Sequence, residues 1–206
     1  MPYRPTDRTR ARLAAARERI VDAALDQLAE GGYASASVVN VARRAGVATG
    51  TVYRHFPAKA DLFAEVFRRA SQREVDALRA MTDREEPVEH RLAAWVEAFV
   101  RRALAEPTRA YALIAEPVDP AVEAERLAFR RAYADLFEKA LHDGVQRQEL
   151  APLEAQLTAA AIVGALAEAL VGPLQRRDQP AGALVAGLQT FVLRSVGITA
   201  HADAHA

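Results

Sequence analysis

The 206-residue sequence contains no cysteine, which excludes disulfide frameworks, thiol catalysis and zinc sites built on cysteine. The uncharged stretch from Leu157 to Ala167, near its C-terminal end, is shorter than the ~20 apolar residues that cross a bilayer. The first twelve residues are polar and rich in arginine, unlike a secretory signal. These absences predict a protein that has no membrane partner and works in the cytoplasm.

Motifs that carry catalysis or bind metals are also missing. The sequence holds no HExxH, GxSxG, GxGxxG or phosphate-binding glycine loop. Its histidines do not follow metal-ligand spacing: His55, His90, His142, His201 and His205. We therefore expect no enzyme, no cofactor and no metal site, although turnover of any substrate would reopen the enzyme hypothesis.

Charge is balanced overall but unevenly distributed. Residues 1–70 contain 12 Arg or Lys and 7 Asp or Glu, a net charge of +5, whereas residues 71–206 contain 15 and 20, a net charge of −5. This asymmetry indicates that the first third meets an anionic partner, although +5 over 70 residues also arises by chance. Only two of the 27 basic residues are lysines, Lys59 and Lys139.

The pattern predicts an all-α protein of about nine helices. Alanine, leucine, arginine and glutamate dominate, and no stretch alternates with the period of a strand. Glycines and prolines mark the expected helix ends, with Gly31-Gly32 ending the first helix and Pro173 ending the penultimate one. The expected helices cover 9–30, two short segments before Pro57, then 57–81, 87–105, 108–115, 120–148, 153–172 and 180–196.

Residues 37–56 have the spacing of a helix-turn-helix motif. Ser37 can cap the first helix, and Ala42 is small enough for close helix contact. Gly46 follows four residues later, where a left-handed turn is needed, and Val52 pins the second helix to the core. The second helix then presents short polar and basic side chains outward, which suits the major groove of DNA. These side chains belong to Thr49, Thr51, Arg54 and His55.

Residues 17–67 resemble the DNA-binding region of the TetR/AcrR family of bacterial transcriptional regulators. The matching pieces are Ile20-Val21-Asp22-Ala23-Ala24, Gly32, Ala42-X-X-Ala45-Gly46-Val47, Gly50-Thr51-Val52-Tyr53-X-His55-Phe56 and Lys59-X-X-Leu62. By this resemblance, phosphate contacts would come from Ser37, Tyr53, His55 and Lys59. Contacts to base edges would come from Thr49, Gly50, Thr51 and Arg54. One departure is Asn40-Val41, where the family often has an acidic residue and isoleucine.

The resemblance also implies a domain organisation. Residues 1–12 would form a flexible Arg-rich arm, reaching DNA or serving as a solubilising tail. Residues 13–60 would form the DNA-binding domain, a three-helix bundle with the helix-turn-helix motif, and 61–198 a larger helical domain for effector binding and dimerisation. Residues 199–206 would be a disordered tail.

A short recognition helix reads few base pairs, so a homodimer on a palindromic site of double-stranded DNA is the usual solution. The last two helices are too apolar for two surface helices and offer an interface, unless they complete the monomer core. The interface candidates are Ala160, Val163, Ala167, Leu170, Leu184, Leu188 and Phe191.

A pocket for a small-molecule effector is implied by the resemblance alone. Aromatic residues at helical spacing are its candidates, with core packing as the alternative: Trp95, Phe99, Tyr111, Phe129, Tyr133 and Phe137. Glu168 interrupts an apolar helix face, where a buried carboxylate would need a ligand or another partner. His90 and Glu116 are weaker candidates.

These observations favour a homodimeric, ligand-responsive regulator that represses transcription and leaves its operator when an effector binds. Two alternatives stay open at this stage. One is a DNA-binding regulator with no small-molecule ligand, and the other is an activator.

Overall fold

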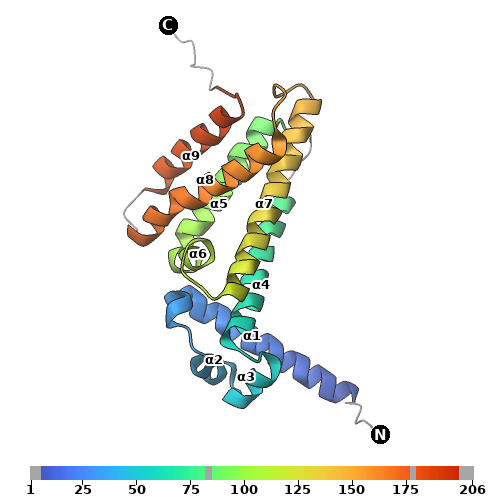
Figure 1. The fold of residues 1–206 in the computed structure, drawn as a ribbon, viewed down its shortest axis with the longest axis vertical. Coiled ribbons are helices and arrows are strands. Elements are labelled where there is room, and N and C mark those ends of the chain that lie inside the picture. The colour runs from blue at the N-terminus through green and yellow to red at the C-terminus, as the bar shows by residue number, and fades with distance from the viewer. Residues whose placement is uncertain (1–5, 82–84, 177–179, 200–206) are drawn as a thin grey trace.

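The computed structural model describes residues 6–81, 85–176 and 180–199, and within these ranges it contains nine helices and no strand. The all-α prediction is thereby confirmed. Three helices form a head at one end of the molecule (Figure 1): α1 (Asp7–Ser35), α2 (Val38–Ala45) and α3 (Thr49–His55). The others form the body: α4 (Lys59–Ala80), α5 (Val88–Ala105), α6 (Pro107–Ile114), α7 (Pro120–Gln146), α8 (Ala155–Arg176) and α9 (Ala181–Ser195).

The head packs around one apolar stripe from each of its helices. Ile20 of α1, Val41 of α2 and Val52 of α3 are almost completely buried in a shared cluster with Phe63 and Phe67 of α4. Helix α4 therefore begins in the head and continues upward into the body beside α7 (Figure 1). A displacement of α4 along its length would move the head with it.

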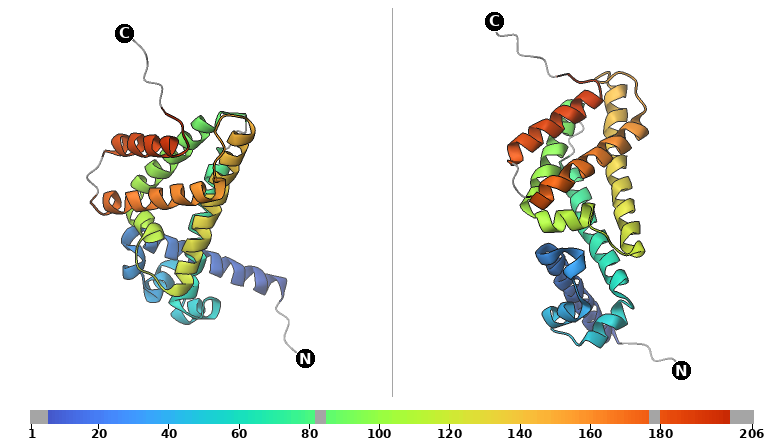
Figure 2. Two further views of the ribbon diagram at one scale, coloured as in Figure 1. Left: turned by 45° about the horizontal axis from the view of Figure 1, so that its top comes forward. Right: turned by 60° about the vertical axis from the view of Figure 1, so that its left-hand side comes forward.

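The body is a bundle with a second core. Helix α7 packs against α4 on one side and α8 on the other, while α9 lies against α5, and Figure 2 shows this arrangement from two further directions. Helix α8 is the one described helix that is long and apolar enough to cross a membrane by length and composition. Buried residues make up 44% of that apolar stretch, as in the core helix of a bundle.

Helix α6 joins the two parts. It lies across α1 near the end that turns toward α2 (Figure 2), and Ala112 and Leu113 of α6 are buried in the head's apolar cluster. Val122 at the start of α7 joins the same cluster. The head is therefore packed directly against the segment between α6 and α7.

Three expected helix boundaries were wrong. Helix α1 does not end at Gly31-Gly32 but continues to Ser35, with a kink where Gly32 has non-helical backbone angles. Helix α1 begins at Asp7, with Thr6 as its cap, so residues 7–12 belong to a helix rather than to a flexible arm. Helix α8 continues past Pro173 to Arg176. A proline removes one helical hydrogen-bond donor, and close to a helix end the burial of Pro173 in the core offsets that loss. Arg4 and the expected tail after residue 199 lie outside the described residues.

Candidate nucleic-acid interface and ligand cavity

The turn between α2 and α3 has the geometry that its sequence predicts. Gly46 adopts φ 65° and ψ 40°, a left-handed conformation that residues with a Cβ adopt only at a cost. Its N–H donates to the Arg43 carbonyl at 3.3 Å, and the Val47 N–H donates to the Ala42 carbonyl at 3.0 Å. These bonds end α2 and direct the chain into α3, so the helix-turn-helix prediction is confirmed.

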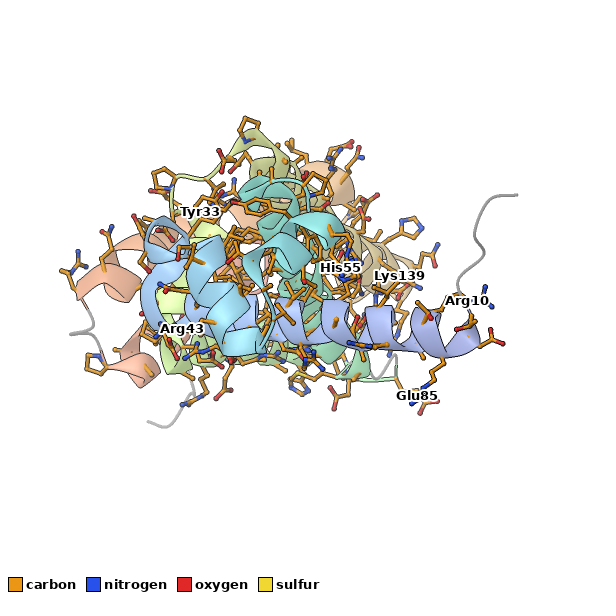
Figure 3. All side chains as sticks on the ribbon, turned by 90° about the horizontal axis from the view of Figure 1, so that it is seen from below. Arg10, Tyr33, Arg43, His55, Glu85 and Lys139 are labelled. Atoms are coloured by element: carbon orange, nitrogen blue, oxygen red, sulfur yellow. The ribbon has the colours of Figure 1, made fainter. Side chains whose placement is uncertain are left out.

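Helix α3 buries one side and presents the other to solvent. Val52 is 1% exposed and holds the helix on the head's core, whereas Gly50, Tyr53 and Arg54 are exposed. Figure 3 looks onto this end of the molecule, with His55 labelled on α3. Arg54 makes no ion pair with any described residue, so its guanidinium is available to an external anion.

Thr49 and Thr51 are partly buried at the base of this surface. Their short side chains leave the exposed Gly50 between them, where DNA could approach the backbone closely. All the residues predicted to touch base edges thus lie on one two-turn helix, within the first 70 residues, whose net charge is +5.

Ser37 performs the capping role predicted for it. Its Oγ accepts a hydrogen bond from the Asn40 N–H at 3.2 Å, and its own N–H donates to Gln27 Oε1 of α1 at 3.1 Å. The Oγ keeps its own proton, which can be donated to a phosphate. Asn40, the departure from the family pattern, does not prevent the cap.

Lys59 opens α4 and is already engaged within the protein. Its Nζ donates to the Tyr33 carbonyl at 3.0 Å and lies 4.3 Å from the centroid of the Tyr33 ring. An ammonium has three donors, so others remain for a phosphate. The sequence indicated only the phosphate role, and the bond to Tyr33 depends on a contact between segments 26 residues apart.

His55 is only partly exposed, and its Nε2 is buried without a hydrogen-bond partner among the described residues. Burial lowers its pKa below the usual value, and the positive charges of Arg54 and Arg17 lower it further. The imidazole is therefore neutral at pH 7. A phosphate contact by His55 would be a hydrogen bond from a neutral ring, unless DNA itself raises the pKa.

Three other arginines of the head form ion pairs within it. Arg44 forms an ion pair with Glu30 at 2.6 Å, and Arg17 bonds Glu65 at 3.2 Å while stacking on the Phe56 ring. Arg10 pairs with Asp7 on the first turn of α1. These ion pairs neutralise three of the positive charges that the sequence places in this region.

An apolar cavity lies inside the body, between α5, α6, α7 and α8. Its volume is about 30 Å³. The aromatic walls pack edge to face, with ring centroids 5.3 Å apart for Trp95 and Phe137 and 4.5 Å apart for Phe129 and Tyr133. Burial raises the pKa of the Tyr133 hydroxyl well above its usual value. Five predicted residues line this cavity: Trp95, Phe99, Phe129, Tyr133 and Phe137.

The two other predicted effector residues do not line this cavity. Tyr111 packs beside the body core without reaching the cavity wall. Glu168 is exposed on the outer side of α8, so the expectation of a buried carboxylate there was wrong. The apolar face that Glu168 interrupts is turned to solvent in the monomer, where a carboxylate needs no partner.

Glu116, a weak ligand candidate in the sequence, instead ties the body to the head. Its carboxylate accepts hydrogen bonds from the backbone N–H groups of Tyr33 at 2.7 Å and Ala34 at 2.9 Å. Gly32 before them has φ 73°, and a Cβ at this position would lie 2.7 Å from the Glu116 carboxylate. The Tyr33 hydroxyl also bonds to Asp119. We call Glu116 and its two bonds the head latch.

Arg126 of α7 supports the latch from the body side. Its guanidinium is buried and donates to the carbonyls of Ala112 and Leu113 at 3.1 Å and of Glu116 at 2.6 Å. Burial lowers its pKa, and the negative charge of Glu123 opposes that shift. Arg126 also lines the apolar cavity, and no sequence motif singled it out. One side chain thus contacts both the cavity and the α6 end that holds the head.

The predicted interface residues divide into two groups. Leu170 is fully buried, and Ala167 and Leu188 are nearly so. These three residues complete the monomer core, which was the alternative to an interface role. Ala160 and Phe191 are exposed. Val163 and Leu184 are partly buried against the body core.

Two family models match the chain in its two parts. Residues 20–66 match the bacterial regulatory proteins of the tetR family, and residues 85–170 match the tetracyclin repressor-like C-terminal domain. Together they span more than half of the sequence. The transcriptional repressor KstR of Mycolicibacterium smegmatis is 44% identical over 68 residues, which is 33% of this chain. The match spans about a third (31%) of that repressor's length.

Solved structures extend the likeness over both parts. The fatty acid degradation regulator FadR from Bacillus halodurans matches with a TM-score of 0.73 at 27% identity, covering 86% of this chain and 94% of that protein. FadR from Bacillus subtilis, solved in complex with stearoyl-CoA, matches with a TM-score of 0.75 at 20% identity, covering 87% and 98%. With its helix-turn-helix head and helical body, the chain belongs to the TetR family of DNA-binding transcriptional regulators.

Proposed function

We propose that the chain is a homodimeric repressor in the cytoplasm that binds a palindromic operator and is released by a small-molecule effector. Helix α3 is two turns long, and one such helix reads only a few base pairs. Two copies related by a two-fold axis would place their α3 helices in major grooves about one helical turn (~34–36 Å) apart. In each copy Thr49, Gly50, Thr51 and Arg54 would read bases, and Ser37, Tyr53, His55 and Lys59 would contact phosphates.

The outer faces of α8 and α9 support a dimer. Leu157 is 71% exposed and Phe191 is 48% exposed, and small residues such as Ala160, Gly164 and Gly187 are exposed beside them. Large apolar side chains among small residues allow helices from two copies to approach closely. The buried members of the predicted set would support this face from within the monomer.

The observation that carries ligand control is the position of Leu113. It is buried in the head's apolar cluster and also lines the body cavity. A ligand that widens the cavity would displace Leu113 and Arg126, and with them the α6 end and the head latch. A preference of ~1–3 kcal/mol for the released state is enough for useful control.

The cavity walls favour an apolar effector or an apolar part of one. Besides Arg126 and Arg130 at one end, every lining residue is aliphatic or aromatic. FadR of Bacillus subtilis, with the same fold, was solved with stearoyl-CoA, so long-chain acyl-CoA is the first probe to try. The cavity of about 30 Å³ must open to admit any such chain.

The test combines sizing with DNA binding by fluorescence anisotropy, on DNA from upstream of the protein's own gene. We expect a dimer that prefers this DNA to competitor DNA and is released by a ligand. Binding with no sequence preference would count against a local operator. A reporter gene under the operator separates repression from activation.

A regulator without any ligand remains the second candidate, because the cavity is so small. The substitution Tyr133→Ala would enlarge the cavity, because it removes the ring of a lining residue. If neither the native protein nor this variant responds to acyl-CoA or other apolar probes, ligand control is wrong and the DNA-binding proposal is unaffected.

A further inference from the structure

A second and larger cleft lies on another side of the body, where α4, α5 and α7 meet. Its volume is about 270 Å³, against about 30 Å³ for the aromatic cavity. Three of its seven lining residues are cations and one is an acid: Arg79, Arg91, Trp95, Leu136, Lys139, Ala140 and Asp143. None of the proposed DNA contacts lies there, and no part of the repressor mechanism above uses its charged residues.

Arg91 is the unusual member of this cleft. It is 2% exposed, yet its guanidinium has only distant partners, the Ala140 carbonyl at 3.4 Å and Asp143 Oδ2 at 3.7 Å. Its Nε is buried and has no hydrogen-bond partner among the described residues. A buried cation is costly unless it is well paired, and these contacts are too long to pair it well.

Trp95 adds a second unpaired donor. It is 2% exposed, and its Nε1 is buried without a hydrogen-bond partner in the described part of the chain. Buried indole N–H groups usually have an acceptor. The Trp95 ring separates the cleft from the aromatic cavity, since the residue lines both.

The charges around the cleft favour an anion. Arg79, Arg91 and Lys139 contribute three positive charges, and Asp143 is the one carboxylate in the lining. Asp76 stands close by and bonds Arg79 weakly at 3.5 Å. Lys139 is exposed and makes no ion pair with a described residue. The lining therefore has a net charge of +2, with two donors that lack acceptors.

We propose that this cleft binds a small-molecule anion through a carboxylate or phosphate group. Arg91 and the Trp95 N–H would donate to it from the buried end, and Lys139 and Arg79 would neutralise it at the rim. The bound anion would link α4, α5 and α7, the helices that form the cleft. The proposal depends only on the body and holds whether or not the DNA contacts are assigned correctly.

Trp95 is the only tryptophan of the chain, so its fluorescence reports on the cleft and on the aromatic cavity that it also lines, and the variants below distinguish the two. The full-length protein is titrated with phosphate, acetate and octanoate at constant ionic strength, with sodium chloride as the reference. We expect a saturable fluorescence change and a rise in Tm, because a ligand that binds only the folded state stabilises it. A response to phosphate alone indicates a phosphate ligand, and a response to octanoate above acetate indicates an apolar acid.

Three variants make the test specific. Arg91→Met and Lys139→Gln should each weaken anion binding by about tenfold or more, as loss of a charge-assisted bond implies. Arg101→Gln, on the same helix as Arg91 but exposed and paired with Glu97 at 2.7 Å, should bind as the native protein does.

Arg91→Met should also raise the Tm in the absence of anion, because it removes an incompletely paired buried charge. Lys139 is exposed, so Lys139→Gln keeps the test decisive if Arg91→Met does not fold. No saturable response to any of the three anions, or an undiminished response in Lys139→Gln, would overturn the proposal. Because this readout needs no DNA, its failure is distinct from failure of the repressor proposal.

Discussion

The head and the body use arginine in opposite ways. In the head, Arg54 is exposed on α3 and makes no ion pair with a described residue. In the body, Arg91 and Arg126 are more than nine-tenths buried. An exposed cation can meet an external polyanion at little desolvation cost, whereas a buried one must find acceptors within reach. Arg126 finds three carbonyls and a carboxylate, and Arg91 finds only distant partners.

The comparison teaches where each part of the proposed function would act. DNA recognition by the head would need only a correctly placed helix on its surface. Ligand control in the body would be internal, and would have to connect the cavity to the head latch through side chains from α6 and α7. The following variants test each side of this difference, beginning with the largest expected effect.

Phe191→Glu should separate the two copies by placing a charge on the outer face of α9. A monomer binds one half-site, so operator affinity should fall by about 10²–10⁴-fold, the usual gain from linking two binding events. Sizing and anisotropy measure both effects. Ala186→Glu, at an exposed position on a different side of α9, is the matched control. A Phe191→Glu protein that stays dimeric would remove α9 from the interface.

Arg54→Ala should reduce operator binding by ~1–3 kcal/mol and binding to random DNA much less, because a base contact carries sequence information. Competition assays with both DNAs measure the difference. Arg43→Ala, an exposed arginine of α2, serves as the control. Equal losses on the two DNAs would make Arg54 a phosphate contact.

Glu116→Gln should weaken the head latch, because an amide has only one acceptor oxygen and directs N–H groups toward the Tyr33 or Ala34 N–H. We expect a loss of about 1–2 kcal/mol in the free energy of unfolding and a weaker response of DNA binding to effector. Urea titration and effector titration measure these two quantities. Glu97→Gln removes an exposed ion pair and should cost less than ~1 kcal/mol. Full ligand control in Glu116→Gln would show that the latch does not transmit it.

Lys59→Gln should weaken binding to every DNA. The slope of log affinity against log salt concentration should become smaller by about 0.9, the change expected for the loss of one phosphate contact. Lys139→Gln provides a control with the other lysine of the chain, far along the sequence in the body. An unchanged slope for Lys59→Gln would mean that Lys59 contacts no phosphate and bonds only within the protein, to Tyr33.

The smallest expected effect is a pH dependence of DNA affinity that arises from His55. Its pKa is lowered in the free protein by burial and by Arg54 and Arg17. A phosphate would favour the charged ring, so binding would take up a proton and affinity should rise as the pH falls from 7.5 to 5.5. Affinities for the native protein and His55→Gln across this range test the expectation. Parallel pH profiles would mean that His55 does not touch phosphate.

Local interactions explain why the head was predictable. The Ser37 cap, the left-handed Gly46 and the burial of Val52 all involve residues close in sequence, so spacing alone indicates them. The same reasoning failed at Pro173, where the helix continues and the proline is buried in the core, and at Asp7, where the Thr6 cap and the Asp7–Arg10 ion pair extend an exposed helix end. Glu168 was misjudged because apolar periodicity does not say whether a face meets the core or solvent.

The sequence by itself determined the helical composition, the helix-turn-helix motif, the exposure of Arg54 on α3 and the aromatic residues of the cavity wall. Each depends on helical periodicity or on turns within a few residues. The tertiary structure alone decided the head latch from Glu116 to Tyr33 and Ala34, the bond from Lys59 to Tyr33 and the meeting of Arg91, Trp95 and Lys139 in one cleft. These contacts join segments 26 or more residues apart or on different helices, and only the packing of the helices brings such side chains within bonding distance.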